Sequence, residues 1–260
     1  MLSTMPIPPR ARRPSSPSTA ADAFGFPRRL PVGSWSLGWA VLVALGVGMA
    51  LWAALDARWP GDVAVAQWVQ DVDPLGAHAL RILRDLGSTV AAAVAFALAV
   101  LVISARWGRR AGLTAGAWGL GFALQGALKL ATDRPRPGPD LLVQFVGTTS
   151  SSFPSGHVMS AVIVGALITW LAVRLPERLP GRLRERRGAR IAVRVPLLVW
   201  GCGLPLFECW TSVAAGVHWP SDVGGGLVWG AVVVLPGLAA LEAQSRRRAG
   251  AVAGISSPSP

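Results

Sequence analysis

The chain has 260 residues, of which 52% are hydrophobic and only 15% are charged, and its mean hydropathy is positive. This composition excludes an ordinary soluble domain, and the long uncharged apolar runs favour a lipid bilayer as the solvent. The net charge of +12 comes without a recognisable nucleic-acid-reading module, so we expect anionic membrane lipids rather than nucleic acid as partners.

The first 34 residues are rich in Pro, Ser and Arg and show no apolar period, which predicts a disordered, basic cytoplasmic tail over 1–34. A cleaved signal peptide is not expected, because the apolar run that follows is too long for an h-region. A six-helix membrane domain is predicted over 35–243, and a disordered C-terminal tail over 244–260.

Six apolar runs follow the tail, each close to the length that crosses a bilayer as a helix. They predict an all-α integral membrane protein, built as a bundle of six transmembrane helices. In chain order the expected spans are 37–55, 88–105, 111–128, 157–173 (extending towards 175), 195–217 and 223–241. In the first connection, Trp68, Asp71 and Asp73 suggest a segment at the membrane interface.

The Lys and Arg residues are unevenly distributed over the connections. With the N-terminus inside, 19 of the 25 fall on the cytoplasmic side. The positive-inside rule therefore predicts a multi-pass plasma-membrane protein with both termini in the cytoplasm. The connections between spans three and four and between spans five and six then face the extracytoplasmic side, so chemistry placed there acts outside the cytoplasm.

Three cations gather at the outer end of the third span, namely Lys129, Arg134 and Arg136. An Arg side chain presents a planar fork that suits phosphate oxygens, and Lys adds a compact point charge. Taken alone, the cluster fits phosphate binding and anchoring of the helix to lipid headgroups equally well.

The stretch Pro154-Ser155-Gly156-His157 opens the fourth span. A helix N-terminus offers unpaired backbone N–H groups and the positive end of the helix dipole, so it favours an anion. Gly156 permits close approach of the backbone, and Ser155 can cap the helix or donate to a phosphate oxygen. The alternative is a capped helix with an interfacial histidine at His157.

His218 and Asp222 lie at the junction of the fifth and sixth spans. Pro220 suits the first turn of a helix, which puts Asp222 within reach of His218. The carboxylate would fix the tautomer of the imidazole and leave its other nitrogen free to attack. A lone His–Asp pair at this spacing is more often structural, but two histidine sites on one membrane face are harder to dismiss.

These segments resemble the signature of the type 2 phosphatidic acid phosphatase superfamily. Its first part, Lys, six residues, then Arg-Pro, is matched by Lys129 and Arg136-Pro137. Its second part, Pro-Ser-Gly-His, is matched in full by residues 154–157. The resemblance covers about residues 37–241, and its six-span layout agrees with the predicted elements.

The third part of the signature, Ser-Arg, five residues, His, three residues, Asp, is matched only in part. His218 and Asp222 are in place, whereas Thr211-Ser212 replaces Ser-Arg. In the family this Arg binds phosphate, and its loss would cost about 2–4 kcal/mol of transition-state stabilisation, roughly 30- to 1,000-fold in rate. Arg134 and Arg84 are candidates for partial compensation.

The resemblance implies roles for the matching positions. His218 would be the nucleophile that forms a phosphohistidine, with Asp222 orienting it. His157 would be the general acid that protonates the leaving lipid alkoxide and later helps to activate water. The phosphate would be held by Lys129, Arg136, Ser155 and Gly156, with Arg134 as a further candidate. No metal and no cofactor are expected.

The resulting hypothesis is a metal-independent phosphatase that removes the terminal phosphate of a lipid phosphate or polyprenyl diphosphate on the non-cytoplasmic face. The resemblance implies polyprenyl diphosphates such as undecaprenyl diphosphate, phosphatidic acid and phosphatidylglycerol phosphate as substrate classes. Two alternatives stay open: a catalytically weakened lipid-phosphate-binding protein, favoured by Ser212, and a lipid phosphotransferase. A transporter is disfavoured, because the sequence has no internal repeat or pair of broken helices.

Other polar residues stand outside these motifs. Glu208, an ionisable residue inside the fifth span, is a functional candidate that could pair with an arginine or lie protonated in a helix interface. His78 has no surrounding motif and is interpreted as structural. Cys202 and Cys209, on one predicted helix, cannot form a disulfide framework. The oligomeric state is not predicted by these patterns.

Overall fold

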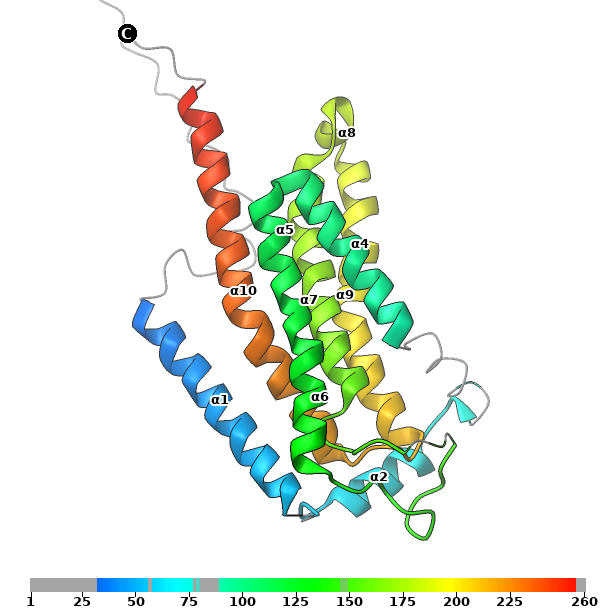
Figure 1. Ribbon diagram of the computed structural model, residues 1–260. Coiled ribbons are helices and arrows are strands. Elements are labelled where there is room, and N and C mark those ends of the chain that lie inside the picture. The colour runs from blue at the N-terminus through cyan, green and yellow to red at the C-terminus, as the bar shows by residue number, and fades with distance from the viewer. Residues whose placement is uncertain are drawn as a thin grey trace, which may run out of the picture. The chain divides into compact units, whose positions relative to one another are not determined.

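The computed structural model describes residues 32–55, 58–76, 79, 89–145, 147 and 149–255, and every regular element among them is a helix (Figure 1). The chain divides into two compact units, 1–37 and 38–260, and the fold below is that of the second unit. The tail predicted over 1–34 lies outside the described residues, except for the first turn of helix α1 (Val32–Ala54).

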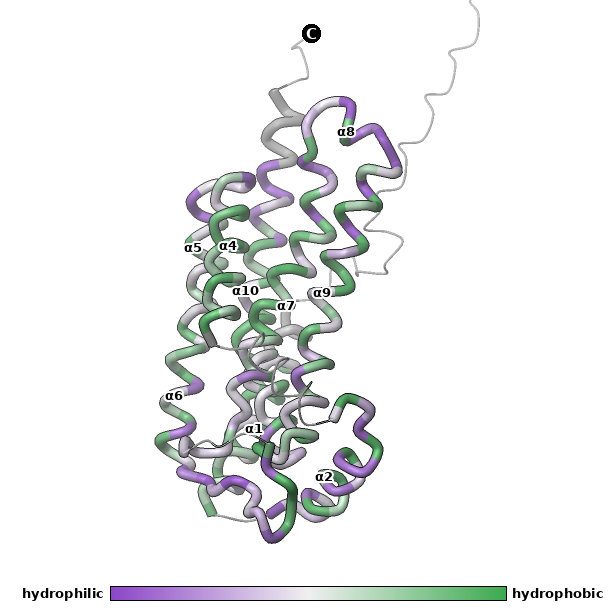
Figure 2. Tube along the Cα trace, turned by 90° about the vertical axis from the view of Figure 1, so that its right-hand side faces the viewer, coloured by the Kyte–Doolittle hydropathy of each residue, from purple (hydrophilic) through white to green (hydrophobic). Residues whose placement is uncertain are grey.

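Among the described residues, five helices are long and apolar enough to cross a membrane. The elements that carry them are α1, α4 (Thr89–Trp107), α7 (Gly156–Arg174), α9 (Arg187–Ala214) and α10 (Pro220–Ile255). A helix satisfies its own backbone hydrogen bonds, which a segment in hydrocarbon must do. Figure 2 shows hydrophobic residues along these helices and hydrophilic residues concentrated towards the ends of the bundle. The prediction of an all-helical fold is thereby confirmed for the described residues, and the five apolar helices agree with a membrane protein.

The predicted third span, 111–128, is divided among three consecutive elements. These are α5 (Arg109–Gly116), the 3-10 turn η2 (Ala117–Gly119) and α6 (Leu120–Thr132). Glycines at both ends of η2 weaken the α-helical hydrogen-bonding pattern there, because glycine has a low helix propensity. None of the three pieces alone has the length of a membrane span. A sixth crossing therefore stays a prediction that requires these pieces to act together.

Helix α7 is the centre of the bundle. Of its apolar window 61% is buried inside the protein, against 11–39% for the other four candidate spans. It packs against α4, α9 and α10. At the crossing with α9, a side chain added at Gly165 would collide with the backbone of Gly201. Small residues at this crossing let the two backbones approach closely, as in many membrane helix pairs.

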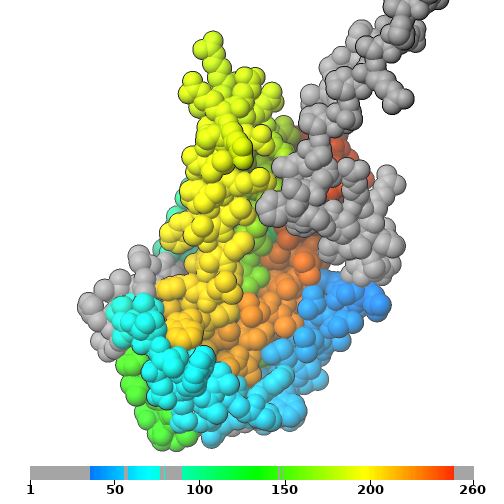
Figure 3. All heavy atoms as spheres, turned by 180° about the vertical axis from the view of Figure 1, so that it is seen from behind, coloured from blue at the N-terminus to red at the C-terminus, as the bar shows by residue number. Residues whose placement is uncertain are grey.

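Helix α2 (Asp62–Asp71) lies at the end of the bundle opposite to α8 (Gly181–Glu185) (Figure 1). Its Gln70 side chain donates to the carbonyl of Val143 at 2.7 Å and to that of Ala214 at 3.1 Å. Figure 3 shows α2 against the ends of α9 and α10. The segment predicted to lie at the interface is thus a short helix that covers one end of the bundle.

Helix α10 continues to Ile255, beyond residue 244, where the C-terminal tail is predicted to begin. The sequence after Leu241 is rich in Ala and Arg, which are strong helix formers. Glu242 and Arg246 also form an ion pair at 2.9 Å, with the acid four residues before the base. Local propensity therefore extends the helix beyond the apolar run that sets the span.

Candidate active site

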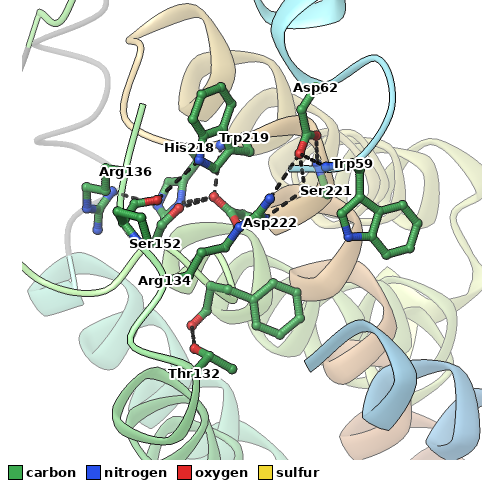
Figure 4. Close-up of polar contacts among 12 residues, drawn as sticks. Trp59, Asp62, Thr132, Arg134, Arg136, Ser152, His218, Trp219, Ser221 and Asp222 are labelled. Atoms are coloured by element: carbon green, nitrogen blue, oxygen red, sulfur yellow. Dashed lines mark hydrogen bonds and ion pairs between the residues drawn. The ribbon is translucent and has the colours of Figure 1, made fainter. Parts of the chain in front are cut away.

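The three motif segments meet at the end of the bundle that α2 covers. The backbone N–H of Ser155 donates to the carbonyl of Asp222 at 3.0 Å, so the start of α7 rests on the start of α10. The N–H of Ser152 donates to the carbonyl of Arg134 at 2.8 Å, which pairs the loop after α6 with the loop before α7. Side chains of the motif segments that lie up to 88 residues apart in sequence thereby come into direct contact (Figure 4).

His218 lies between α9 and α10 with only 1% of its surface exposed. Its Nδ1 is 3.5 Å from Oδ2 of Asp222, and its Nε2 is 3.3 Å from a guanidinium nitrogen of Arg136. Burial lowers the pKa of His218 from its usual 6.5 to about 4, although the neighbouring carboxylate of Asp222 acts in the opposite direction. The imidazole is therefore neutral near pH 7, as a nitrogen nucleophile must be.

Asp222 is fully buried in the first turn of α10, which Pro220 begins. Its Oδ2 accepts the backbone N–H of Trp219 at 2.8 Å, closing the start of the helix. The same oxygen accepts the hydroxyl of Ser152, and Oδ1 accepts from Arg134 at 2.6 Å. Because both oxygens are held, the carboxylate has a fixed orientation next to the ring of His218.

Arg136 and Lys129 place two cations beside His218. Arg136 donates to the carbonyl of Ser150 at 2.8 Å and to its hydroxyl at 3.0 Å, which fixes the guanidinium next to Nε2 of the ring. The ammonium of Lys129 donates to the carbonyl of Ser151. An anion that approaches Nε2 of His218 would therefore meet a positively charged surface.

Arg134, the third cation of the cluster, faces two carboxylates. It is 2% exposed, and its guanidinium donates to Asp222 at 2.6 Å and to Asp62 at 3.0 Å. These contacts favour a structural position behind Asp222, and a role for Arg134 in holding phosphate stays a prediction.

Ser155 and Gly156 form the N-terminus of α7. Ser155 is fully buried, and its hydroxyl has no hydrogen-bond partner in the part of the chain that the structure describes. It therefore remains available to a ligand. A side chain added at Gly156 would meet the side-chain amide of Gln125 on α6, which would have to move to make room.

His157 lines a cavity of about 170 Å³ between α4, α7 and α9. Most of the lining is apolar, and the polar side chains that reach it include Ser160 and Glu208. Glu208 is 2% exposed, so the acid predicted inside the fifth span is buried beside this cavity. His157 thus borders an apolar space, while the backbone of Ser155 contacts the start of α10.

Thr211 and Ser212 replace the Ser-Arg pair of the third motif, on the last turn of α9. Both are fully buried, and neither hydroxyl has a hydrogen-bond partner among the described residues. A serine hydroxyl carries no charge, so the guanidinium that the family places here has no equivalent at this position.

Sequence reasoning missed two contributors, Asp62 and Ser152. Ser152 belongs to a run of three serines before the second motif, a weak signal for hydroxyl donors. Asp62 stands alone after Gly61, and nothing in its neighbourhood marks it. Arg84 and His78 lie outside the described residues. Within the described ranges no group of three or more His, Cys, Asp or Glu side chains could hold a metal ion.

The sequence model of the PAP2 superfamily matches residues 110–246, a stretch that contains all three motif segments. Comparison with curated proteins gives no significant match. Among solved structures, the chain is similar to the first transmembrane PAP2 type phosphatidylglycerolphosphate phosphatase from Bacillus subtilis. The TM-score is 0.58 and the identity 21%, over 77% of this chain and 96% of that one. The structural likeness supports the fold, and the match over more than half of the sequence shows that this chain belongs to the PAP2 superfamily.

Proposed function

We propose that the protein is a membrane phosphatase that hydrolyses the terminal phosphate of a lipid phosphate or polyprenyl diphosphate through a phosphohistidine on His218. The observation that carries the proposal is the setting of this ring. It is buried and neutral, a carboxylate lies beside one nitrogen, and a guanidinium lies beside the other. A site that only binds phosphate needs cations. It does not need a neutral histidine nitrogen held between a carboxylate and a guanidinium.

In the first step, Nε2 of His218 attacks phosphorus. The Nε2–P bond forms while the bond from phosphorus to the leaving oxygen breaks, and protonated His157 gives its proton to that oxygen. Asp222 stabilises the positive charge on the phosphorylated ring. Developing charge on the transferred group is stabilised by Lys129 and Arg136, together with the Ser155 hydroxyl and the Gly156 amide.

In the second step, water attacks the phosphohistidine and passes a proton to His157. The new O–P bond forms, the Nε2–P bond breaks, and inorganic phosphate leaves with His218 neutral again. The leaving lipid of the first step needs an apolar place next to the general acid. The cavity beside His157 supplies such a place, with Ala91, Ala92 and Ala95 of α4 in its wall.

The substrate classes proposed are phosphatidic acid, phosphatidylglycerol phosphate and polyprenyl diphosphates, including undecaprenyl diphosphate. The similar solved structure is described as a phosphatidylglycerolphosphate phosphatase, which supports the second of these. We further propose that both termini are cytoplasmic, that six helices cross the plasma membrane, and that the site faces the extracytoplasmic side. The excess of Lys and Arg in the connections assigned to the cytoplasm supports this orientation.

The test is release of phosphate from a panel of purified lipid phosphates in the presence of a chelator, which also examines metal independence. Wild type is expected to release phosphate and to show an acid-labile, base-stable phosphoenzyme after rapid quenching of labelled substrate. His218→Ala is expected to lose both signals. The matched control is His78→Ala, the one histidine outside the motifs, and it should keep both.

The second candidate is a protein that binds lipid phosphate without hydrolysing it, which the uncharged Ser212 favours. Binding without phosphate release in wild type, unchanged in His218→Ala, would support this candidate against the enzyme. Transfer of label to an added alcohol instead of water would identify a lipid phosphotransferase.

A further inference from the structure

Asp62 is a buried carboxylate that none of the three motifs contains. It begins α2, is 3% exposed, and lies outside the stretch that matches the PAP2 superfamily. Its Oδ1 accepts the backbone N–H of Ser221 at 2.9 Å. Its Oδ2 accepts the hydroxyl of Ser221 at 2.7 Å and the N–H of Trp59 at 3.1 Å. The carboxylate is therefore directed at the first turn of α10, where the nucleophile's partner Asp222 lies.

Arg134 connects Asp62 to Asp222. One terminal nitrogen of its guanidinium donates to Asp222 Oδ1 at 2.6 Å, and the other donates to Asp62 Oδ2 at 3.0 Å (Figure 4). All three side chains are at most 3% exposed. When all are ionised, one buried cation is shared by two buried carboxylates, and the trio carries one net negative charge. Buried charges require such pairing, because an uncompensated one is strongly destabilising.

The shared cation matters for chemistry at His218. Phosphorylation at Nε2 makes the ring cationic when Nδ1 is protonated, and Asp222 is the carboxylate that faces Nδ1. If Arg134 were paired with Asp222 alone, their charges would cancel, and the ring would have only the cations Arg136 and Lys129 on its other side. Because Arg134 is also paired with Asp62, it does not fully neutralise Asp222. The three side chains together therefore keep one net negative charge beside the ring of His218.

We propose that Asp62 and Arg134 are positioning residues for phosphoryl transfer. Together they hold Asp222 in place and leave one negative charge facing His218. The inference rests on the proposed function, since it assigns a task to the same site. Asp62 acts through Arg134 and Asp222, not by contact with substrate. Helix α2 therefore completes the site from outside the three motifs.

The experiment compares Asp62→Asn, Arg134→Gln and the double variant, each purified in lipid nanodiscs. Each single change alters the net charge of the trio, and the double change restores it. We expect each single variant to lower kcat by about 10- to 100-fold with KM within about threefold, because a positioning residue acts through Asp222 and does not contact the substrate. The double variant should recover at least about tenfold in kcat over the lower single variant. A purely structural loss would not recover.

Two controls accompany these variants. Asp71→Asn changes an exposed acid of the same helix and should leave kcat unchanged. Asp62→Glu keeps the charge and should retain more activity than Asp62→Asn. If Asp62→Asn does not fold, the charge-balanced double variant and Asp62→Glu still decide the matter, because neither changes the net charge of the trio.

The outcomes separate this inference from the proposed function. An active wild type with kcat of Asp62→Asn equal to that of Asp71→Asn would overturn the inference alone. Losses in the two single variants that simply multiply in the double variant would also overturn it. A wild type that neither releases phosphate nor forms a phosphoenzyme from any of the lipids overturns both.

Discussion

The proposed nucleophile must be neutral to attack phosphorus, and burial favours the neutral form of His218 by lowering the pKa of its ring. Water would stabilise the protonated ring, and the site excludes water from it. Asp222 opposes this effect by favouring the cation, whereas Arg136 and Lys129 add to it. In the proposed mechanism the ring becomes charged only when it is phosphorylated, and Asp222 lies beside Nδ1 before that step.

This electrostatic balance predicts the acidic limb of the pH profile. The pKa of His218 is lowered to about 4, so the neutral ring persists as pH falls through 6.5 and is lost only as pH falls through about 4. In kcat/KM, corrected for ionisation of the substrate phosphate, the limb assigned to His218 should lie near pH 4. Asp222→Asn removes a group that raises the pKa, so it should move this limb to still lower pH. A limb near 6.5 in wild type would contradict the account.

The buried hydroxyl of Ser212 makes a second prediction at the scale of one residue. Ser212→Arg would restore the guanidinium of the third motif, and a charge-assisted hydrogen bond to phosphate is stronger than a neutral one. Inorganic phosphate should then inhibit about tenfold more tightly, which corresponds to roughly 1.4 kcal/mol. The measurement is the inhibition constant of phosphate, with Thr211→Arg, a neighbour that points to another side of α9, as the control. Equal constants in wild type and in folded Ser212→Arg would place residue 212 away from the phosphate.

At the scale of elements, helix α2 supports the site by packing on segments that connect the motifs. Gln70 contacts Val143 in both directions, because its amide nitrogen donates to the carbonyl and its oxygen accepts the N–H. Its nitrogen also donates to the carbonyl at the end of α9. A single side chain thereby ties α2 to the segment after α6 and to the helix that precedes His218.

Removing this tie should loosen α2 without unfolding the bundle. Gln70→Ala leaves the carbonyls of Val143 and Ala214 without their donor, a loss of about 0.5–1.5 kcal/mol for the local opening of α2. Hydrogen exchange of the α2 amides should accelerate accordingly, while the amides of α7 keep their rates. Gln67→Ala is the control, because Gln67 donates only one bond, at 3.3 Å, to Leu141. Equal acceleration in the two variants would show that Gln70 does not hold the helix.

The helices and the motifs could be predicted from the sequence because each depends on residues that are close together in the chain. Apolar runs locate five of the spans to within a turn or two at most ends. Helix α9 is an exception, since it starts eight residues before the predicted Val195. Its arginine-rich first turns are helical although they are not apolar. The spacing of His218 and Asp222 within one turn predicted their proximity. The break at η2 and the extension of α10 to Ile255 depend on propensities that an apolar count ignores.

Asp62 could not be found in the same way. Its partners Arg134 and Ser221 are 72 and 159 residues away in sequence, and each contact exists only because α2 folds back over the end of the bundle. A single acid after a glycine has no spacing to reveal it. Arg134 illustrates the same limit, since its charge was visible in the sequence but the two carboxylates that share it were not.

At the scale of the whole molecule, the second unit places charged chemistry at one end of an apolar bundle. The His218 site gathers at the α2 end, and the cavity beside His157 lies among the apolar faces of α4, α7 and α9. A lipid phosphate has the same division, with a charged head and an apolar body. This match between the molecule and its proposed substrate requires only that the α2 end lies at a membrane surface. It holds equally for the cytoplasmic and the extracytoplasmic surface.

The choice of surface can be tested by labelling single cysteines in intact cells. The predicted orientation puts the α2 end outside, because the arginine-rich segment around α8 at the opposite end belongs in the cytoplasm. In a background with Cys202 and Cys209 changed to Ser, we expect a membrane-impermeant maleimide to label Asp140→Cys at once. It should label Arg184→Cys only after the cells are permeabilised, since both positions are exposed and differ only in side. The reverse pattern would put phosphate release in the cytoplasm and overturn the proposed sidedness, while the contacts around His218 and the chemistry argued from them would stand unchanged.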